Sequence, residues 1–257
     1  MTAPGGLPID EVVALCRRLR LKYVRQQVED VVLTARAQRW DPAEMLRTLL
    51  AAEAQGRDRA TVEVKRRRAR FPAGKTFDTW DASRSSIPTA TQRALGSLEW
   101  LSRHENLAIA GPSGTGKSHL LEAIGQKVVE EGLTVAWFSV EDLGALVRRH
   151  RVDDTVSRAF ASLAAVSLTV VDDIGLLPIS ADAAEGLYRL VDAAYEKRSV
   201  AISSNLHPSA LDQLMGRTIA SALVDRLLHH AHVIVTDGES VRLADATSGK
   251  GVVPLAS

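Results

Sequence analysis

The N-terminal part of the chain has apolar residues at helical spacing. Between residues 9 and 70 they recur at Val12, Leu15, Cys16, Leu19, Val24, Val28, Val31 and Val32. This pattern predicts a helix with one apolar face. The stretch Asp-Pro-Ala-Glu at residues 41–44 combines a capping side chain, a first-turn proline and an early acid, and it predicts the start of a second helix. We expect a third helix to carry residues 61–70.

After residue 70 the pattern changes to short apolar runs separated by longer amphipathic stretches. Proline, glycine and serine predict a linker at about 71–88. Strands are expected at 107–110, 134–138, 168–171, 200–203 and 232–235, with helices at 116–131, 180–197 and 208–230. Such alternation predicts an α/β fold with a mostly parallel five-stranded sheet flanked by helices. The expected organisation is a small all-α domain over 1–75 and an α/β domain over 76–257.

The composition is that of a soluble globular protein. The chain has 257 residues, of which 46% are hydrophobic, and no apolar run is long enough to cross a membrane. A single cysteine, Cys16, excludes a disulfide framework and a cysteine-based zinc site, and we expect it to be a small core residue. Without a signal-peptide pattern, a cytoplasmic protein that has no membrane partner is expected.

The small net charge hides an asymmetry between the two parts of the chain. Residues 1–75 contain 16 Lys and Arg against 9 Asp and Glu, and residues 76–257 contain 16 against 22. A basic segment joined to an acidic one favours a polyanionic partner for the basic part.

One motif has the spacing of a phosphate-binding loop. Gly-Pro-Ser-Gly-Thr-Gly-Lys-Ser at 111–118 fits G-x-x-x-x-G-K-[ST] and lies between a predicted strand and a predicted helix. Its glycines allow backbone N–H groups to surround a polyphosphate, and the helix N-terminus adds positive potential. The predicted nucleotide contacts are Gly111, Pro112, Ser113, Gly114, Thr115, Gly116, Lys117, Ser118 and His119, with Lys117 on the phosphates and Ser118 on Mg²⁺.

Two adjacent acids follow the third predicted strand. We expect Asp172 to hold Mg²⁺ and Asp173 to activate the attacking water as general base. A carboxylate that caps the next turn is the alternative for each of them. The strand after that ends at Asn205, whose amide would orient the same water, although asparagine also commonly begins turns.

With these elements the chain resembles an AAA+ P-loop NTPase, and more narrowly the IstB-like transposition helper family, which is related to the DnaC helicase loaders. The resemblance covers nearly the whole chain and includes the stretches LVDRLLHHAHVI and GESVRL. It implies ATP and Mg²⁺ as cofactors, and double-stranded DNA, a transposase and further copies of the chain as partners. It also implies that Arg226 is an arginine finger acting on a neighbouring subunit. A surface pair with Asp225 or a helix-end cation is the alternative for Arg226, and Arg217 is the reserve candidate.

The sequence departs from the family pattern at one position and fits it in another respect. The family usually has Glu where this chain has Asp173, which is one methylene shorter, so slower hydrolysis or ATP binding without hydrolysis is an open alternative. About 20 residues follow the last predicted strand, so the C-terminal helical lid of many AAA+ proteins is expected to be absent, together with its second sensor arginine.

Three further stretches have more than one interpretation. Phe77 or Trp80 in FDTWD either packs beside the adenine or anchors the linker. The run of Lys65, Arg66, Arg67, Arg68 and Arg70 predicts sequence-independent DNA phosphate contact, with a solvated helix face as the alternative. The same two interpretations apply to the basic run at 148–151. His229, His230 and His232 have no cysteine or carboxylate at a suitable spacing, so metal binding is not expected there.

The function that these features favour is an ATP-dependent, DNA-binding helper of a transposase. A DnaC-like helicase loader is the alternative within the same superfamily. A small-molecule P-loop kinase would leave the basic N-terminal segment without a role.

Overall fold

The computed structural model describes residues 9–175 and 178–247. The chain divides into two compact units, Met1–Val64 and Lys65–Ser257. The division lies inside one helix, α3 (Pro42–Ala69). The domain boundary predicted from the sequence lies later, at residue 75.

The smaller unit contains α1 (Ile9–Arg18), α2 (Lys22–Gln38) and the first part of α3. Its core includes Cys16, Val24, Val28 and Leu49, so the expectation of a buried Cys16 is confirmed. The expected first helix is two helices, because Arg20 adopts a left-handed conformation with φ of 58° that ends α1.

The second and third expected helices are a single helix of 28 residues. Gly56 lies in its interior, where glycine usually weakens a helix. Here the ring of Tyr23 packs so closely on Gly56 that a Cβ atom would overlap it. Gly56 is therefore a packing position and not a helix end.

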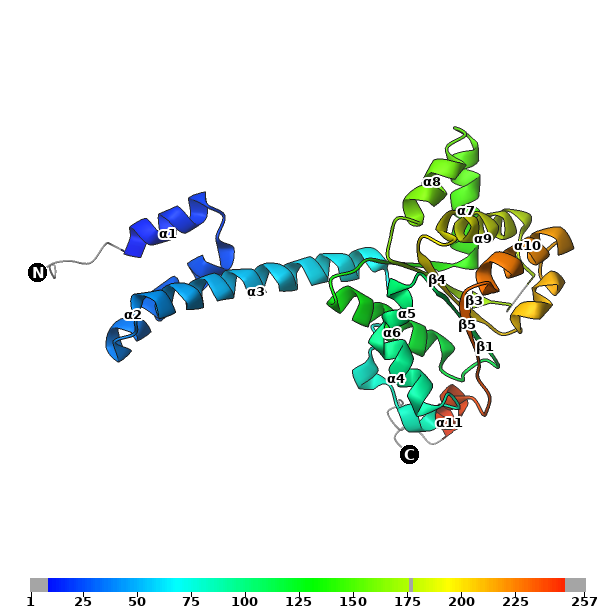
Figure 1. Ribbon diagram of the computed structural model, residues 1–257, viewed down its shortest axis with the longest axis horizontal. Helices are drawn as coiled ribbons and strands as arrows, with labels where there is room; N and C mark the ends of the chain where they lie inside the picture. Colours follow the sequence, from blue (N-terminus) through cyan, green and yellow to red (C-terminus); the bar gives the residue numbers. More distant parts are fainter. Residues whose placement is uncertain (1–8, 176–177, 248–257) are drawn as a thin grey trace, which may run out of the picture. The chain divides into compact units, whose positions relative to one another are not determined.

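The larger unit is built on a parallel sheet of five strands (Figure 1). The strands are β1 (Asn106–Ala110), β2 (Val135–Ser139), β3 (Leu168–Ile174), β4 (Ser199–Ser204) and β5 (Ala231–Val235). Their order across the sheet is β2-β3-β4-β1-β5, and every neighbouring pair is parallel. The expected α/β class and parallel five-stranded sheet are confirmed.

The helices that follow α3 are α4 (Thr89–Ser97), α5 (Glu99–Ser102), α6 (Lys117–Glu130), α7 (Val140–Arg151), α8 (Val156–Leu163), α9 (Ala181–Ala194), α10 (Arg217–Leu228) and α11 (Val241–Thr247). Helices α6 to α10 connect successive strands of this sheet, α4 and α5 precede β1, and α11 follows β5. Short 3₁₀ turns occur at Phe77–Thr79, Ala82–Arg84 and Pro208–Gln213. The expected single helix over 208–230 is thus a 3₁₀ turn followed by α10, which begins after Gly216.

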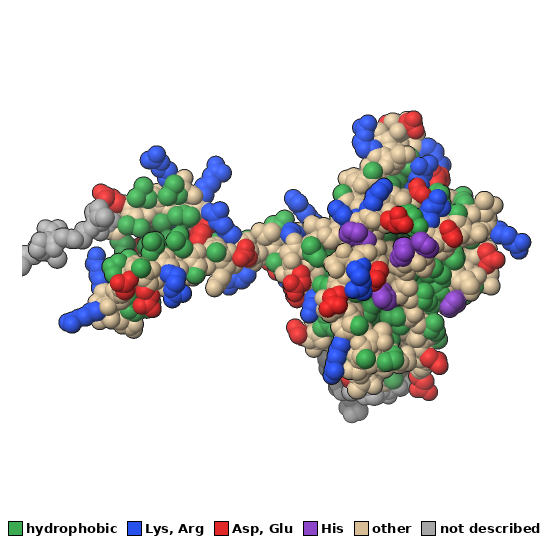
Figure 2. Space-filling model, viewed as in Figure 1, with side chains coloured by type: hydrophobic (Ala, Val, Ile, Leu, Met, Phe, Trp, Pro, Cys, Tyr) green, Lys and Arg blue, Asp and Glu red, His purple; other side chains and the backbone are tan. Residues whose placement is uncertain are grey.

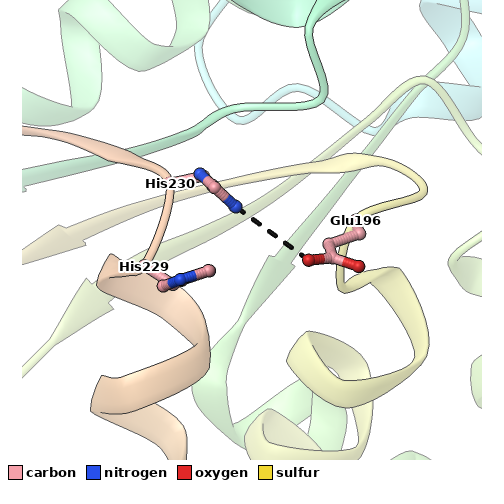
Figure 3. A group of neighbouring side chains, drawn as sticks. All are labelled: Glu196, His229 and His230. Atoms are coloured by element: carbon pink, nitrogen blue, oxygen red, sulfur yellow. Dashed lines mark ion pairs between the residues drawn. The ribbon is translucent and has the colours of Figure 1, made fainter.

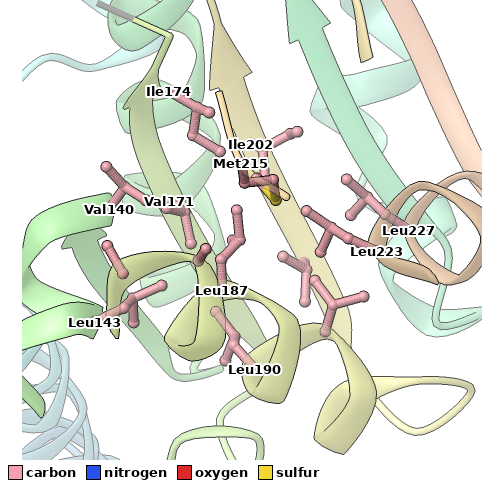
Figure 4. Close-up of a cluster of buried hydrophobic side chains, with 14 of the residues drawn as sticks. Val140, Leu143, Val171, Ile174, Leu187, Leu190, Ile202, Met215, Leu223 and Leu227 are labelled. Atoms are coloured by element: carbon pink, nitrogen blue, oxygen red, sulfur yellow. The ribbon is translucent and has the colours of Figure 1, made fainter. Parts of the chain in front are cut away.

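The main core lies between the sheet and the helices α7, α8, α9 and α10 (Figure 4). Val171 and Ile202 from the strands meet Leu143 from α7 and Leu187 from α9 there. Helix α6 packs against β2, β3 and β4 outside this cluster. Strands that are covered by helices on both faces consist of nearly continuous apolar residues. The apolar runs in the sequence therefore predicted these strands.

The segment 71–75, expected to begin a linker, is packed along α6. The ring of Phe71 lies against Gly125, where a Cβ atom would be 2.7 Å from the ring. The backbone amides of Ala73 and Gly74 both donate to the carboxylate of Glu122, which is buried. This segment therefore belongs to the larger unit and is fixed by side-chain and backbone contacts.

Within the described residues, every helix is too short or too polar to span a bilayer.

Candidate nucleotide-binding site

The phosphate loop connects β1 to α6, as the motif predicted. Gly111, Gly114 and Gly116 all have positive φ, with values of 147°, 86° and 89°. A side chain at Gly111 would overlap Thr236, and one at Gly114 would overlap Ser240. The loop therefore needs glycine both for its backbone conformation and for close contact with the segment behind it.

That supporting segment follows β5 and was not assigned a role from the sequence. The amide of Thr236 donates to Ala110 at 2.7 Å, and its hydroxyl lies 2.7 Å from the hydroxyl of Thr115. The amide of Val241, the first residue of α11, donates to the carbonyl of Gly114 at 3.0 Å. The chain after β5 thus fixes the phosphate loop from behind, which only the pairing of β5 with β1 makes possible.

Lys117 is buried and engaged, with an exposed fraction of 5%. Its Nζ donates to the carbonyls of Gly111 and Pro112 at 2.8 Å each and to Oδ1 of Asn205 at 2.9 Å. Burial lowers the pKa of Lys117 despite the nearby carboxylates. Beyond the phosphate contact that the motif predicts, Lys117 therefore also holds the loop and Asn205 together.

Asp172 and Asp173 lie at an irregularity of the sheet. β3 continues through both acids to Ile174, past the expected end at residue 171, and its register with β4 shifts between Val171 and Ile174. Asp173 has a left-handed conformation with φ of 69° and is exposed. Its amide donates to the hydroxyl of Ser203 at 2.9 Å. Bulges of this kind are common beside active sites because they redirect side chains.

The carboxylate of Asp172 faces the start of α6. It accepts hydrogen bonds from the hydroxyls of Ser118, at 2.9 Å, and of Ser203. Burial raises the pKa of Asp172, with a further contribution from Asp173. A half-buried carboxylate in contact with a hydroxyl fits an oxygen-ligated Mg²⁺ ion, which would compensate the charge.

Asn205 lies between the loop and the acids. β4, which ends just before Asn205, separates β1 from β3 in the sheet. The amide oxygen of Asn205 accepts from Lys117, and its backbone N–H donates to Ile174 at 2.9 Å. The structure therefore brings together all four elements that the sequence singled out: the loop, the two acids and the amide.

A cavity of about 380 Å³ lies between the phosphate loop and the two acids, and Asn205 is not among the described residues that line it. Ser113, Gly114, Gly116, Lys117, Ser118, His119, Asp172 and Asp173 line it, together with Pro72, Ala73, Lys75, Glu122, Val241, Arg242 and Asp245. The contributions from residues 72–75 and from α11 were not predicted. A signal for the second existed in GESVRL, which the resemblance singled out without assigning it a role.

Trp80 is fixed beside this cavity and does not line it. Its Nε1 donates to Gln92 at 2.7 Å, and its ring meets the ring of His119 edge to face at 5.1 Å between centroids. Phe77 and Trp80 line a separate cavity of about 750 Å³ beside α4 and α6. Of the two interpretations of FDTWD, these contacts favour an anchor on the core.

Arg226 is held by helix α9 in its own chain. Its Nε lies 3.0 Å from Oδ1 of Asp192, and its guanidinium lies 5.4 Å from the centroid of the Tyr188 ring. A pair with Asp225 is not what the structure shows. Arg217, the reserve candidate, is the exposed first residue of α10.

The basic run at the end of α3 is divided between two environments. Lys65 donates to the carbonyl of Gly132, and Arg66 contacts Gln126 at 2.8 Å and Glu130 at 3.3 Å on α6. Arg67, Arg68 and Arg70 are exposed. In the second basic run, at 148–151, two arginines pair with acids of α9.

The fold places a carboxylate beside two of the three histidines, contrary to the sequence interpretation. Glu196, which follows α9, lies next to His229 and His230. His232 contacts a different acid, Glu105, at 2.7 Å. Sequence spacing gave no signal for either pair, because the partners come from separate elements.

Comparison with known proteins identifies the family. The model of the IstB-like ATP binding protein family matches residues 14–248. The chain belongs to this family. A Pseudomonas aeruginosa relative, the ATP-binding protein of insertion sequence IS21, is 30% identical over 91% of this chain and 89% of its own. The ATP-binding protein of insertion sequence IS232 from Bacillus thuringiensis subsp. berliner is 29% identical over 88% and 92%.

Solved structures support the fold of this IstB-like chain. The replication initiator DnaA bound to AMPPCP and single-stranded DNA superposes with a TM-score of 0.55 at 18% identity, covering 70% of this chain and 55% of that chain. The DnaC helicase loader gives a TM-score of 0.50 at 18% identity, covering 65% and 99%. At this identity the likeness establishes the AAA+ fold alone.

Proposed function

We propose that this protein is a DNA-binding ATPase that assists the transposase of an insertion sequence. The observation that carries the proposal is the convergence of Lys117, Ser118, Asp172 and Asp173 on one cavity in an IstB-like chain, with Asn205 hydrogen-bonded to Lys117. The relatives named after insertion sequences supply the biological context.

Each side chain has a role in hydrolysis that its contacts support. Lys117 and the loop amides would bind the phosphates of ATP, and Ser118 and Asp172 would hold Mg²⁺, which would neutralise charge on the phosphates. Asp173 is the general base for the attacking water, and its exposed carboxylate on a bulge has room to accept that proton. Asn205 is already aligned by Lys117, so its amide orients the water beside the phosphates.

The active site is completed by a second copy of the chain. Arg226 contacts α9 in its own subunit and is not among the described residues that line the cavity. An arginine supplied from a neighbour stabilises the charge that develops on the transferred phosphoryl group. We infer a homo-oligomer in which Arg226 of one subunit meets the nucleotide of the next, a heterologous contact that forms a ring or a helical filament.

DNA binding is assigned to the first residues of the larger unit, 65–75. Residues 1–64 contain 10 Lys and Arg against 9 Asp and Glu, so the positive excess of the N-terminal part lies in residues 65–75. Arg67, Arg68 and Arg70 are exposed, so we assign phosphate contact mainly to these three side chains.

The DNA assignment is tested by the salt dependence of binding. Affinity should fall with salt with a log–log slope of about −0.9 for each phosphate neutralised. Changing Arg67, Arg68 and Arg70 together to alanine should weaken binding to all duplex sequences alike. The loss of two to three phosphate contacts should make the log–log slope less negative by roughly 2–3.

A matched control separates local contact from net charge. Changing Arg17, Arg18 and Arg20 to alanine removes the same charge from the smaller unit. If the two triple variants have the same log–log salt slope, then Arg67, Arg68 and Arg70 form a solvated helix face, and the assignment of DNA contact to them is wrong.

The transposase partnership is tested against the helicase-loader alternative. ATP-dependent capture of the transposase encoded beside this gene, in the presence of DNA, supports the proposal. ATP-dependent capture of the replicative helicase, with no transposase bound, would replace it with the loader function.

A further inference from the structure

Three side chains that can bind a metal ion lie close together at the C-terminal ends of α9 and α10 (Figure 3). Glu196 follows α9, His229 caps α10, and His230 comes next. Their potential ligand atoms all lie within 4.8 Å of one another, and Nε2 of His230 is 4.0 Å from Oε1 of Glu196. Histidine side chains gather on this face of the larger unit (Figure 2).

We propose that Glu196, His229 and His230 form a binding site for a divalent transition-metal ion, with Zn²⁺ as the ion that fits best. Two imidazoles and one carboxylate are the donor set of open zinc sites, in which water or another ligand takes the fourth position. Imidazole donors select against Mg²⁺ and Ca²⁺, which prefer oxygen ligands. The site is therefore distinct from the Mg²⁺ site at Asp172.

The geometry requires only a small adjustment. A tetrahedral ion with bonds of about 2.0–2.1 Å holds its ligand atoms roughly 3.4 Å apart. The three groups must therefore move by about 1 Å or less to surround the ion. All three side chains are exposed, so this movement disturbs no packed core.

A fourth residue orients one ligand. The hydroxyl of Tyr195 lies 3.0 Å from Nδ1 of His229 and fixes the ring at one nitrogen. Within the described residues the other nitrogen, Nε2, has no hydrogen-bond partner. Zinc-bound histidines characteristically use their second nitrogen in this way, and the outer partner contributes to affinity. An ion bound here would tie the end of α9 to the end of α10, the helix that carries Arg226.

The test is a zinc titration of the full, untagged, metal-free protein by isothermal titration calorimetry without nucleotide. We expect the wild-type protein to bind close to one equivalent of Zn²⁺. His229→Ala and Glu196→Gln should each weaken that binding at least tenfold. Tyr195→Phe should weaken it by less than His229→Ala does, and by no more than about 100-fold.

His232→Ala is the matched control, because His232 is also exposed but pairs with Glu105. It should bind Zn²⁺ as the wild type does, and Zn²⁺ should raise the melting temperature of both and not that of His229→Ala. The proposal is overturned if the wild type binds no Zn²⁺, or if His229→Ala and His232→Ala bind it equally well. None of these variants touches the nucleotide cavity, so the result is independent of the ATPase proposal.

Discussion

Replacing Lys117 with alanine should impair both ATP binding and the stability of the nucleotide-free protein. The ammonium group makes three hydrogen bonds of 2.8–2.9 Å, two to the phosphate loop and one to Asn205. The variant loses the phosphate contact and also the bonds that hold the loop against β4. A lysine that merely faced the ligand would affect ATP affinity alone.

The magnitude follows from two opposing contributions. Hydrogen bonds that involve a charged group contribute about 1.5–3 kcal/mol each. Burial lowers the pKa of Lys117, so part of this gain offsets the cost of removing the ammonium from water. We therefore expect a net loss of about 1–3 kcal/mol in the free energy of unfolding, well below the sum for three bonds. Loss of one charged phosphate contact of about 1.5–3 kcal/mol should weaken ATP binding roughly 10- to 150-fold.

The assay combines urea denaturation of the nucleotide-free protein with calorimetric titration of ATP. Lys127→Ala is the control, because Lys127 lies near the other end of α6, away from the phosphate loop. The control should bind ATP normally and lose less than about 0.5 kcal/mol of stability. Unchanged ATP affinity in Lys117→Ala would refute the phosphate assignment. Unchanged stability would refute the bridging role.

Two further predictions concern the acids and the helix packing. Burial raises the folded-state pKa of Asp172, so its contribution to stability is lost as pH rises through that pKa. Asp172→Asn retains an oxygen acceptor for Ser118 and Ser203, so it should stabilise the nucleotide-free protein at neutral pH. It should also abolish Mg²⁺-dependent ATPase activity. A variant that is no more stable at pH 7 than the wild type would contradict the effect of burial. In Gly186→Ala, the new Cβ would lie 2.9 Å from the backbone of Leu143, so overpacking of about 1–3 kcal/mol should outweigh the gain of about 0.8–1 kcal/mol in helix propensity. Thermal melting checks the sign, and a rise in melting temperature would show that α7 and α9 can separate.

The sequence predicted the parts of the nucleotide site that depend on local pattern. The phosphate loop has a fixed spacing of residues, and the buried strands are apolar on both faces. Both could therefore be predicted from the sequence. Asn205 was singled out only as the end of a strand. Its position between Lys117 and the acids depends on β4 lying between β1 and β3, which is a property of the sheet order.

Contacts between segments that are distant in the chain could not be predicted from the sequence. Arg66 reads as part of a basic run, yet α6 supplies Gln126 and Glu130 as its partners. Glu196 carries no recognisable relation to His229 until α9 and α10 pack together. In each case the chemistry of the side chain was evident and its partner was not, because tertiary packing selects the partner.

Mixing two inactive variants tests whether the ATPase site is shared between subunits. Arg226→Ala should bind ATP but lose turnover, since a finger contributes roughly 10³–10⁵ in rate in related chemistry. Asp173→Asn should also be inactive, because it lacks the base while keeping its finger. In an equal mixture on DNA, roughly one interface in four joins an intact Asp173 to an intact Arg226 from the next subunit.

The measurement is the ATPase rate of that mixture, with co-assembly of the two variants verified by light scattering. If the site is shared, hydrolysis should reappear on mixing, at up to about a quarter of the wild-type rate. A mixture that co-assembles and remains inactive would contradict it, because Arg226 would then not act on a neighbouring subunit.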